Sequence, residues 1–143
     1  MLTALIDYES GNLHSALKAF EKISSENSLG SVTITNDPEI ISNADRLVLP
    51  GDGAFPACKA ALEKSEVFEA LKHAVLAKRR PFLGICVGMQ LMAKKGFEFE
   101  PTNGLNWING QVERIQLDDP SLKIPHMGWN EIAIDYDLSL IHI

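Results

Sequence analysis

Short, almost continuously apolar runs alternate along this chain with longer stretches in which apolar residues recur every three or four positions. The first pattern predicts buried strands, and the second predicts amphipathic helices. The expected strands cover residues 2–8, 32–35, 47–49 and a run that begins at Pro81. The expected helices cover residues 13–23, a short segment from Pro38, residues 54–77 with a weak point at 63–65, and residues 89–92. This alternation predicts an α/β fold with a doubly wound, mostly parallel sheet and helices on both faces.

The pattern changes after Met92, where glycine and proline residues divide the chain into short extended pieces. Residues 111–115 and 131–135 have the alternating composition of strands. We expect antiparallel β additions after residue 100, at one side of the main sheet. The chain has no linker or internal repeat, so its 143 residues are expected to form a single domain.

Composition and charge narrow the functional classes. The formal net charge is −6, and the basic residues are scattered apart from residues 78–80, so no nucleic-acid-binding surface is expected. No apolar run approaches the roughly 20 residues of a membrane span, and the first five residues lack the basic lead of a signal peptide. These features favour a cytoplasmic protein with no membrane contact. The two cysteines suit free thiols, and the four histidines lack metal-ligand spacing, so no metal or cofactor is expected.

The segment from Pro81 to Met92 combines a short apolar strand, a Gly-x-Cys-x-Gly turn and a helical run. This is the pattern of a nucleophile elbow with Cys86 as the nucleophile. Gly84 and Gly88 provide the small neighbours that such a tight turn requires. A cysteine at a helix N-terminus is also placed to react as a thiolate. The alternative is a buried structural cysteine, because free cysteine is among the most buried residue types.

Three unusual loops follow expected strands, at residues 9–12, at residues 50–53 and at Cys86. Ligands of a doubly wound sheet gather outside the carboxyl ends of its strands, so these loops are expected to share one rim. Gly51 and Gly53 would allow a backbone N–H to approach a substrate, forming an oxyanion hole with the N–H of Val87. The alternative is that both glycines only form a tight turn.

Several motifs together resemble the class I glutamine amidotransferases, and among them the glutaminase subunits of imidazole glycerol phosphate synthases of histidine biosynthesis. The motifs are Ile6-Asp7-Tyr8 with Gly11-Asn12-Leu13, Leu49-Pro50-Gly51 with Gly53-Ala54-Phe55, the elbow from Gly84 to Leu91, and Pro125-His126-Met127-Gly128-Trp129-Asn130. The likeness extends from residue 3 to about residue 134. The elbow alone indicates only the superfamily, whereas the first and last motifs indicate this type of subunit.

The resemblance implies that Cys86 attacks the side-chain amide of glutamine and forms a glutamyl thioester. Water then hydrolyses the thioester to glutamate, and ammonia is the useful product. By position, Gly53 and Val87 would supply the oxyanion N–H groups, and Gln90 and Glu98 would hold the amino-acid end of glutamine. The alternative for Gln90 and Glu98 is that they are ordinary polar surface residues.

The resemblance also implies a partner, a cyclase subunit that receives the ammonia in a heterodimer. Asn12 and residues Pro125, His126, Met127, Gly128, Trp129 and Asn130 would face this cyclase. For Trp129, packing in the core is the alternative.

Two features depart from the family pattern. Asp52 stands where a small apolar residue is usual in the Pro-Gly-x-Gly loop. The family's cysteine also works with a downstream His-x-Glu, and none of the four histidines here has a glutamate two residues later. We therefore expect a C-terminally truncated and severely impaired enzyme of marginal stability, with a non-native tail at residues 137–143. A non-catalytic partner-binding fragment, another cysteine-elbow amidase and an oxidative-stress protein of the same fold are the alternatives.

Overall fold

A parallel four-stranded sheet forms the centre of the computed structural model, which describes residues 1–119, 121–125, 127–129 and 131. The strands are β1 (Leu2–Ile6), β2 (Ser31–Thr35), β3 (Arg46–Leu49) and β4 (Phe82–Gly84). They lie in the order β2-β1-β3-β4, and every neighbouring pair is parallel. The four strands expected from the apolar runs are therefore present, and the parallel sheet is confirmed.

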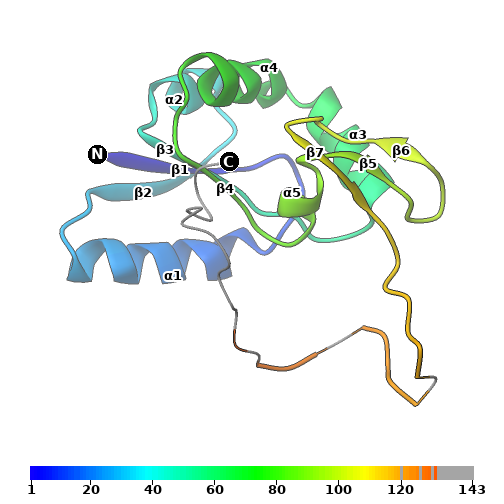
Figure 1. Ribbon diagram of the computed structural model, residues 1–143. Helices are drawn as coiled ribbons and strands as arrows, with labels where there is room; N and C mark the ends of the chain where they lie inside the picture. Colours follow the sequence, from blue (N-terminus) through cyan, green and yellow to red (C-terminus); the bar gives the residue numbers. More distant parts are fainter. Residues whose placement is uncertain (120, 126, 130, 132–143) are drawn as a thin grey trace.

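Helices cover both faces of this sheet, as expected (Figure 1). α1 (Leu13–Glu26) lies along one face, and α2 (Pro38–Asn43) and α4 (Val67–Lys72) lie on the other. Asn12 caps α1 by accepting a hydrogen bond from the Ser15 N–H, and Asp37 caps α2 in the same way through the Glu39 N–H. These caps satisfy N–H groups that a helix cannot satisfy internally.

The long helical stretch expected over 54–77 consists of three segments. α3 (Phe55–Lys64) ends at the weak point of the pattern, α4 follows, and the π-helical turn η1 (His73–Ala77) completes the stretch. The Ser65 N–H donates to the carbonyl oxygens of both Ala61 and Leu62, which closes α3. The chain therefore turns at residues 65–66 before it continues in helical form.

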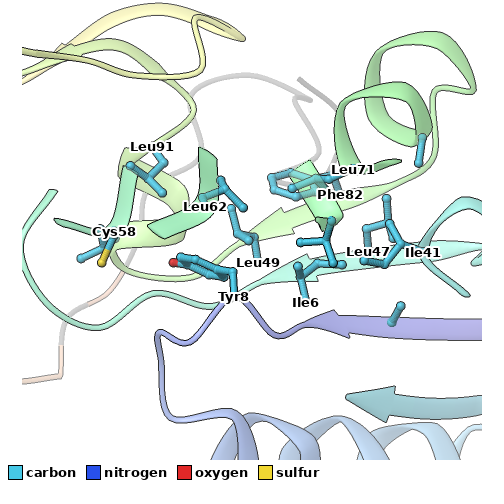
Figure 2. Close-up of a cluster of buried hydrophobic side chains, with 14 of the residues drawn as sticks. Ile6, Tyr8, Ile41, Leu47, Leu49, Cys58, Leu62, Leu71, Phe82 and Leu91 are labelled. Atoms are coloured by element: carbon cyan, nitrogen blue, oxygen red, sulfur yellow. The ribbon is translucent and has the colours of Figure 1, made fainter. Parts of the chain in front are cut away.

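The hydrophobic core lies between the sheet and the helices α2, α3 and α4. Side chains of β1, β3 and β4 meet those of the helices there (Figure 2). Ile6, Leu49, Leu62 and Leu71 are fully buried. Burial of each such side chain is worth about 1.5–3 kcal/mol, so this layer fixes the sheet against its helical cover.

The β structure after the elbow differs from the expectation. β5 (Ala93–Gly96), β6 (Thr102–Asn103) and β7 (Ile108–Val112) form a second, separate sheet in the order β6-β5-β7. β5 pairs antiparallel with β6 but parallel with β7, so the expected antiparallel pairing is present in part, in a sheet separate from the main one. The chain loops back after β6, and this return gives β7 the direction of β5. The predicted strand at 111–115 begins earlier, at Ile108, and the one at 131–135 lies almost entirely outside the described residues.

The helix of the elbow is also shorter than expected. α5 covers only Val87–Gln90, and β5 starts three residues later, where a helix was predicted as far as Met92. The N–H groups of Leu105 and Trp107 donate to the carbonyl oxygens of Leu91 and Met92, so the second sheet captures the backbone just after α5. Within the described part of the chain, no helix is long and apolar enough to cross a membrane.

Candidate active site

Cys86 occupies a strained position between β4 and α5. Its backbone has φ +55° and ψ −119°, a conformation that side chains with a Cβ rarely adopt. Its thiol is exposed to solvent, so the alternative of a buried structural cysteine is wrong. A residue held in such a conformation costs on the order of 1–3 kcal/mol and is characteristic of functional sites.

The two glycines around Cys86 are required by close backbone contacts. A Cβ at Gly84 would lie 2.5 Å from the Met89 Cα, and a Cβ at Gly88 would overlap the Leu49 carbonyl oxygen. Strand β4 and helix α5 therefore approach each other more closely than any other residue type allows. This is the steric requirement that the Gly-x-Cys-x-Gly pattern predicted.

The three loops expected at one rim lie against one another. The Ile85 N–H donates to the Leu49 carbonyl oxygen at 3.0 Å, which joins the elbow to the end of β3. A Cβ built on Gly51 would lie 2.5 Å from the Gly88 nitrogen, and one built on Gly11 would lie 3.0 Å from the Pro50 Cβ. The loop at residues 50–53 is thus packed between the elbow and the β1–α1 loop.

The backbone N–H groups of Val87 and Gly53 are the two that are predicted to stabilise an oxyanion. Among the described residues, neither the Val87 N–H nor the Gly53 N–H has a hydrogen-bond acceptor. In contrast, the Gly88 N–H donates to the Ile85 carbonyl oxygen, and the Asp52 N–H donates to the Ser10 hydroxyl. The Gly51 and Cys86 N–H groups likewise have no acceptor among the described residues, so hydrogen bonding does not single out the two groups predicted to stabilise an oxyanion.

The 50–53 loop is held by side chains of the β1–α1 segment whose role the sequence pattern did not indicate. The Tyr8 hydroxyl donates to the Pro50 carbonyl oxygen at 2.8 Å, and the Ser10 hydroxyl donates to the Asp52 carbonyl oxygen at 2.9 Å. Cys58 lies under the same loop, and the Tyr8 hydroxyl points toward it in Figure 2. Burial raises the pKa of Tyr8 from 10.0 to about 12, although the neighbouring Ser10 hydroxyl acts in the opposite direction.

Gln90 and Glu98 lie near the elbow and the loop, respectively. Gln90 is partly buried and is the last residue of α5, four residues after Cys86, and its N–H donates to the Cys86 carbonyl oxygen. Glu98 is exposed, and its Oε2 accepts a hydrogen bond from the Phe55 N–H at 2.7 Å. Phe55 is the first residue of α3, so Glu98 caps this helix, a role that the sequence did not reveal.

The residues predicted to face a partner are exposed where the structure describes them. Asn12, Pro125 and Gly128 are exposed, as are Met127 and Trp129, with exposed fractions of 84% and 103%. The alternative of a core role for Trp129 does not agree with this exposure. His126 and Asn130 lie outside the described residues.

Two of the four histidines are described, and both His14 and His73 are exposed on helices, whereas His126 and His142 are outside the described residues. No group of three His, Cys, Asp or Glu side chains that could hold a metal ion occurs in the part of the chain that the structure describes.

Comparison with known proteins shows the family. The family described as glutamine amidotransferase class-I matches residues 4–139. The chain is 57% identical over 136 residues to the imidazole glycerol phosphate synthase subunit HisH of Ruegeria pomeroyi, which covers 94% of this chain and 64% of the relative. The subunit HisH of Cereibacter sphaeroides is 55% identical over 137 residues, covering 95% of this chain and 65% of the relative.

A third relative, the subunit HisH of Caulobacter vibrioides, is 51% identical over 132 residues, covering 92% of this chain and 62% of the relative. The chain thus spans slightly less than two thirds of the length of the relatives it matches. These matches confirm the resemblance that the motifs indicated. With the family profile extending over nearly all of its residues, the chain belongs to the class I glutamine amidotransferases.

Proposed function

We propose that this chain carries the nucleophile of a glutaminase that hydrolyses glutamine to glutamate and supplies ammonia to a cyclase subunit. The observation that supports it most directly is the exposed Cys86 thiol on a strained turn between two glycines that permit no side chain. The relatives, named as subunit HisH of imidazole glycerol phosphate synthase, support this substrate and this pathway. The reaction would take place in the cytoplasm, where histidine biosynthesis occurs.

The geometry supports a reaction in two stages. The Cys86 sulfur attacks the carbonyl carbon of the glutamine side-chain amide, and the electron pair of the carbonyl moves to oxygen. The Val87 and Gly53 N–H groups stabilise this oxyanion. Its collapse expels the amide nitrogen, which leaves as ammonia after protonation, and a thioester remains. Water then attacks the thioester and releases glutamate. Gln90 would hold the amino-acid end of the substrate, together with the Glu98 carboxylate oxygen that does not accept from the Phe55 N–H.

Protonation of the leaving nitrogen and activation of water require a general acid and base. The 143-residue polypeptide contains no His-x-Glu sequence. We propose that this polypeptide by itself hydrolyses glutamine very slowly, because loss of the histidine in triad enzymes costs on the order of 10⁴–10⁶ in rate. Ammonia release near the rate of the full-length relatives would contradict this proposal.

A glutamine-shaped alkylating agent tests the assignment of the nucleophile without the need for turnover. The diazoketone 6-diazo-5-oxo-L-norleucine is incubated with the 143-residue chain, and the labelled peptide is identified by mass spectrometry. We expect modification of Cys86, slowed by excess L-glutamine, and no modification of Cys58, whose side chain is buried. Labelling that L-glutamine does not slow would show that no glutamine site surrounds the thiol.

The partner surface is tested separately by binding of a cyclase subunit in a pull-down and by titration. The expected heterodimer is supported by the exposure of Met127 and Trp129, two residues of the motif from Pro125 to Asn130. We expect Trp129→Ala to weaken binding by about tenfold or more, because aromatic anchors dominate interfaces. Phe99→Ala is the matched control, since Phe99 is an exposed aromatic residue, 89% accessible, outside the motif.

A second candidate function, a non-catalytic partner-binding fragment, is favoured by the lack of His-x-Glu in this polypeptide. It predicts cyclase binding without protection of Cys86 by glutamine. The first candidate predicts both properties. Absence of cyclase binding together with glutamine protection would instead indicate a different cysteine-elbow amidase.

A further inference from the structure

We propose that Tyr8 is a positioning residue for the Cys86 nucleophile, because its buried hydroxyl holds the Pro50–Gly51 peptide group against the elbow. This inference rests on the proposed function and adds to it a residue that does not touch the substrate. The evidence is one buried hydrogen bond, the close approach of the 50–53 loop to α5, and the strained backbone of Cys86.

The Pro50 carbonyl oxygen depends on Tyr8 for its hydrogen bond. The Tyr8 hydroxyl donates to it at 2.8 Å, and among the described residues no backbone N–H does so. Both Pro50 and Gly51 are buried, whereas the next two residues of the loop are exposed to solvent. A buried carbonyl group that lacks a donor is costly in free energy. This peptide group therefore takes the orientation in which the Tyr8 hydroxyl can donate to it.

The Tyr8 side chain is a rigid anchor for this bond. Only 2% of the residue is exposed, and its ring belongs to the cluster of buried side chains in the core (Figure 2). A tyrosine side chain has only two torsion angles, so packing of the ring in the core also fixes the place of its hydroxyl. Burial raises the pKa of Tyr8 to about 12, so the hydroxyl keeps the proton that it donates at neutral pH.

The peptide group that Tyr8 holds lies directly on the first residues of α5. A Cβ built on Gly51 would lie 2.5 Å from the Gly88 nitrogen and 3.0 Å from the Val87 Cβ. A Cβ built on Gly88 would lie 3.2 Å from the Pro50 carbonyl carbon. The Cβ built on Gly51 would also lie 3.0 Å from the Tyr8 hydroxyl oxygen. The hydroxyl and the start of α5 thus meet at the same small space, which only a glycine leaves open.

The end of β3 and the loop after it contact the chain immediately before and immediately after Cys86. Before it, the Ile85 N–H donates to the Leu49 carbonyl oxygen at 3.0 Å, and after it, Val87 lies against Gly51. Between these contacts the Cys86 backbone has φ +55°, a strained conformation that persists only where the surrounding structure enforces it. The tyrosine hydroxyl secures the second contact, so it acts on the direction of the Cys86 thiol without touching it.

Two alkylating reagents separate the position of the thiol from its intrinsic reactivity. With 6-diazo-5-oxo-L-norleucine, the diazo carbon takes the thiol proton, the sulfur bonds to this carbon, and the C–N bond breaks with release of dinitrogen. The glutamine site holds this reagent, so its alkylation step depends on how the sulfur is directed toward the carbon. Iodoacetamide reacts with the same sulfur by expulsion of iodide and is not held in one orientation. Both reactions can be measured on the 143-residue chain.

The measured quantities are KI and kinact of the diazoketone at Cys86, from the concentration dependence of labelling, and the rate constant of iodoacetamide at the same residue. A misplacement of a reacting group by about 1 Å can cost about 10² in rate, so we expect Tyr8→Phe to lower kinact by about tenfold or more. KI and the iodoacetamide rate constant should be unchanged, because the glutamine contacts and the exposure of the thiol remain. Circular dichroism establishes that each variant is folded under the conditions of labelling.

Ser24→Ala is the matched control. Ser24 is also buried, with 7% of the residue exposed, and its hydroxyl donates to the Gly30 carbonyl oxygen at 2.8 Å. This variant loses the same kind of bond at α1 rather than at the elbow, and it should keep the wild-type kinact. Urea unfolding of both variants measures the stability that each bond contributes, so that a loss of stability can be told from a loss of position.

The outcomes distinguish this inference from the proposed function. If L-glutamine does not slow labelling of the wild-type chain, the proposed glutamine site itself is refuted. If L-glutamine slows labelling and Tyr8→Phe keeps the wild-type kinact, the role of Tyr8 is refuted and the site stands. If kinact and the iodoacetamide rate constant fall by the same factor, the hydroxyl changes the reactivity of the thiol rather than its position, which also overturns the proposed role. An equal loss of kinact in Ser24→Ala would do the same.

Discussion

Replacement of Cys86 by glycine is expected to stabilise the protein relative to replacement by alanine. Alanine keeps the Cβ and with it the strain at φ +55° and ψ −119°, whereas glycine adopts this conformation without steric cost. The thiol is exposed, so little buried surface is lost in either variant. The Met89 and Gln90 N–H groups donate to the backbone carbonyl of Cys86, and these bonds are retained in both.

The magnitude is the difference between two effects. Relief of strain contributes on the order of 1–3 kcal/mol, and the greater entropy of glycine in the unfolded chain opposes it by about 0.5–1 kcal/mol. We expect the glycine variant to be more stable by about 1 kcal/mol. With a denaturant dependence of about 1–3 kcal/mol per molar urea, the unfolding midpoint should rise by about 0.5 M.

Equilibrium urea unfolding followed by circular dichroism measures this difference, with the two variants compared at one pH and one protein concentration. Ala60→Gly is the matched control, because Ala60 is an exposed residue inside α3, where glycine costs about 1 kcal/mol. Glycine should thus stabilise at the elbow and destabilise in the helix. A glycine variant at residue 86 that is less stable than the alanine variant would refute the assignment of strain to this residue.

Three further predictions concern the supports of the site. Gly88→Ala should lower the free energy of unfolding by about 2 kcal/mol or more, or prevent folding, because the new Cβ overlaps the Leu49 carbonyl oxygen. Gly110→Ala is the control in the same urea titration. It should be nearly neutral, because a Cβ there would have only one neighbouring side-chain atom, 3.9 Å away. Glu98→Ala should cost about 1 kcal/mol through loss of the α3 cap, and Glu98→Gln should restore most of it; equal losses in both variants would contradict the capping role. Burial raises the pKa of Tyr8 from 10.0 to about 12, so the protonated hydroxyl contributes its full stabilisation of the folded state below pH 10. About 2–3 kcal/mol of the free energy of unfolding is then lost as the pH rises from 10 to 12. Tyr8→Phe should lack this part of the alkaline loss in unfolding titrations.

The main sheet was predictable because its strands are short runs of apolar or β-branched residues between turn residues, and its central strands β1 and β3 are largely buried. The sequence of β5, the first strand of the second sheet, does not predict a strand. β5 has the sequence Ala93-Lys94-Lys95-Gly96, which contains no β-branched or aromatic residue. Its conformation comes from hydrogen bonds to β6 and β7 and from packing of Gly96 on the Phe55 ring. Tertiary contacts thus decide the structure of this segment against its local propensity.

The elbow and its two glycines were predictable because their steric requirement is local in sequence. The support of the 50–53 loop was not, because Ser10 contacts Asp52 across 42 positions and Cys58 across 48. A serine beside Gly11 and a cysteine in an amphipathic helix carry no distinctive pattern of their own. Only the packing of three strand ends at one rim shows that these ordinary residues meet beneath the loop.

The contacts that shape the elbow position the Cys86 thiol but do not provide the general base that amide hydrolysis also needs. The turn is held by the Leu49 carbonyl oxygen, by the close approach of Gly51 to Gly88, and by the bonds from Tyr8 and Ser10 to the loop. None of these contacts involves a general base. The turn that presents the thiol is therefore formed whether or not a base is present, and we expect acylation by an activated ester to be fast where amide hydrolysis is slow. Because an activated ester needs no protonation of its leaving group, the difference between the two rates measures what a base would add to the nucleophile alone.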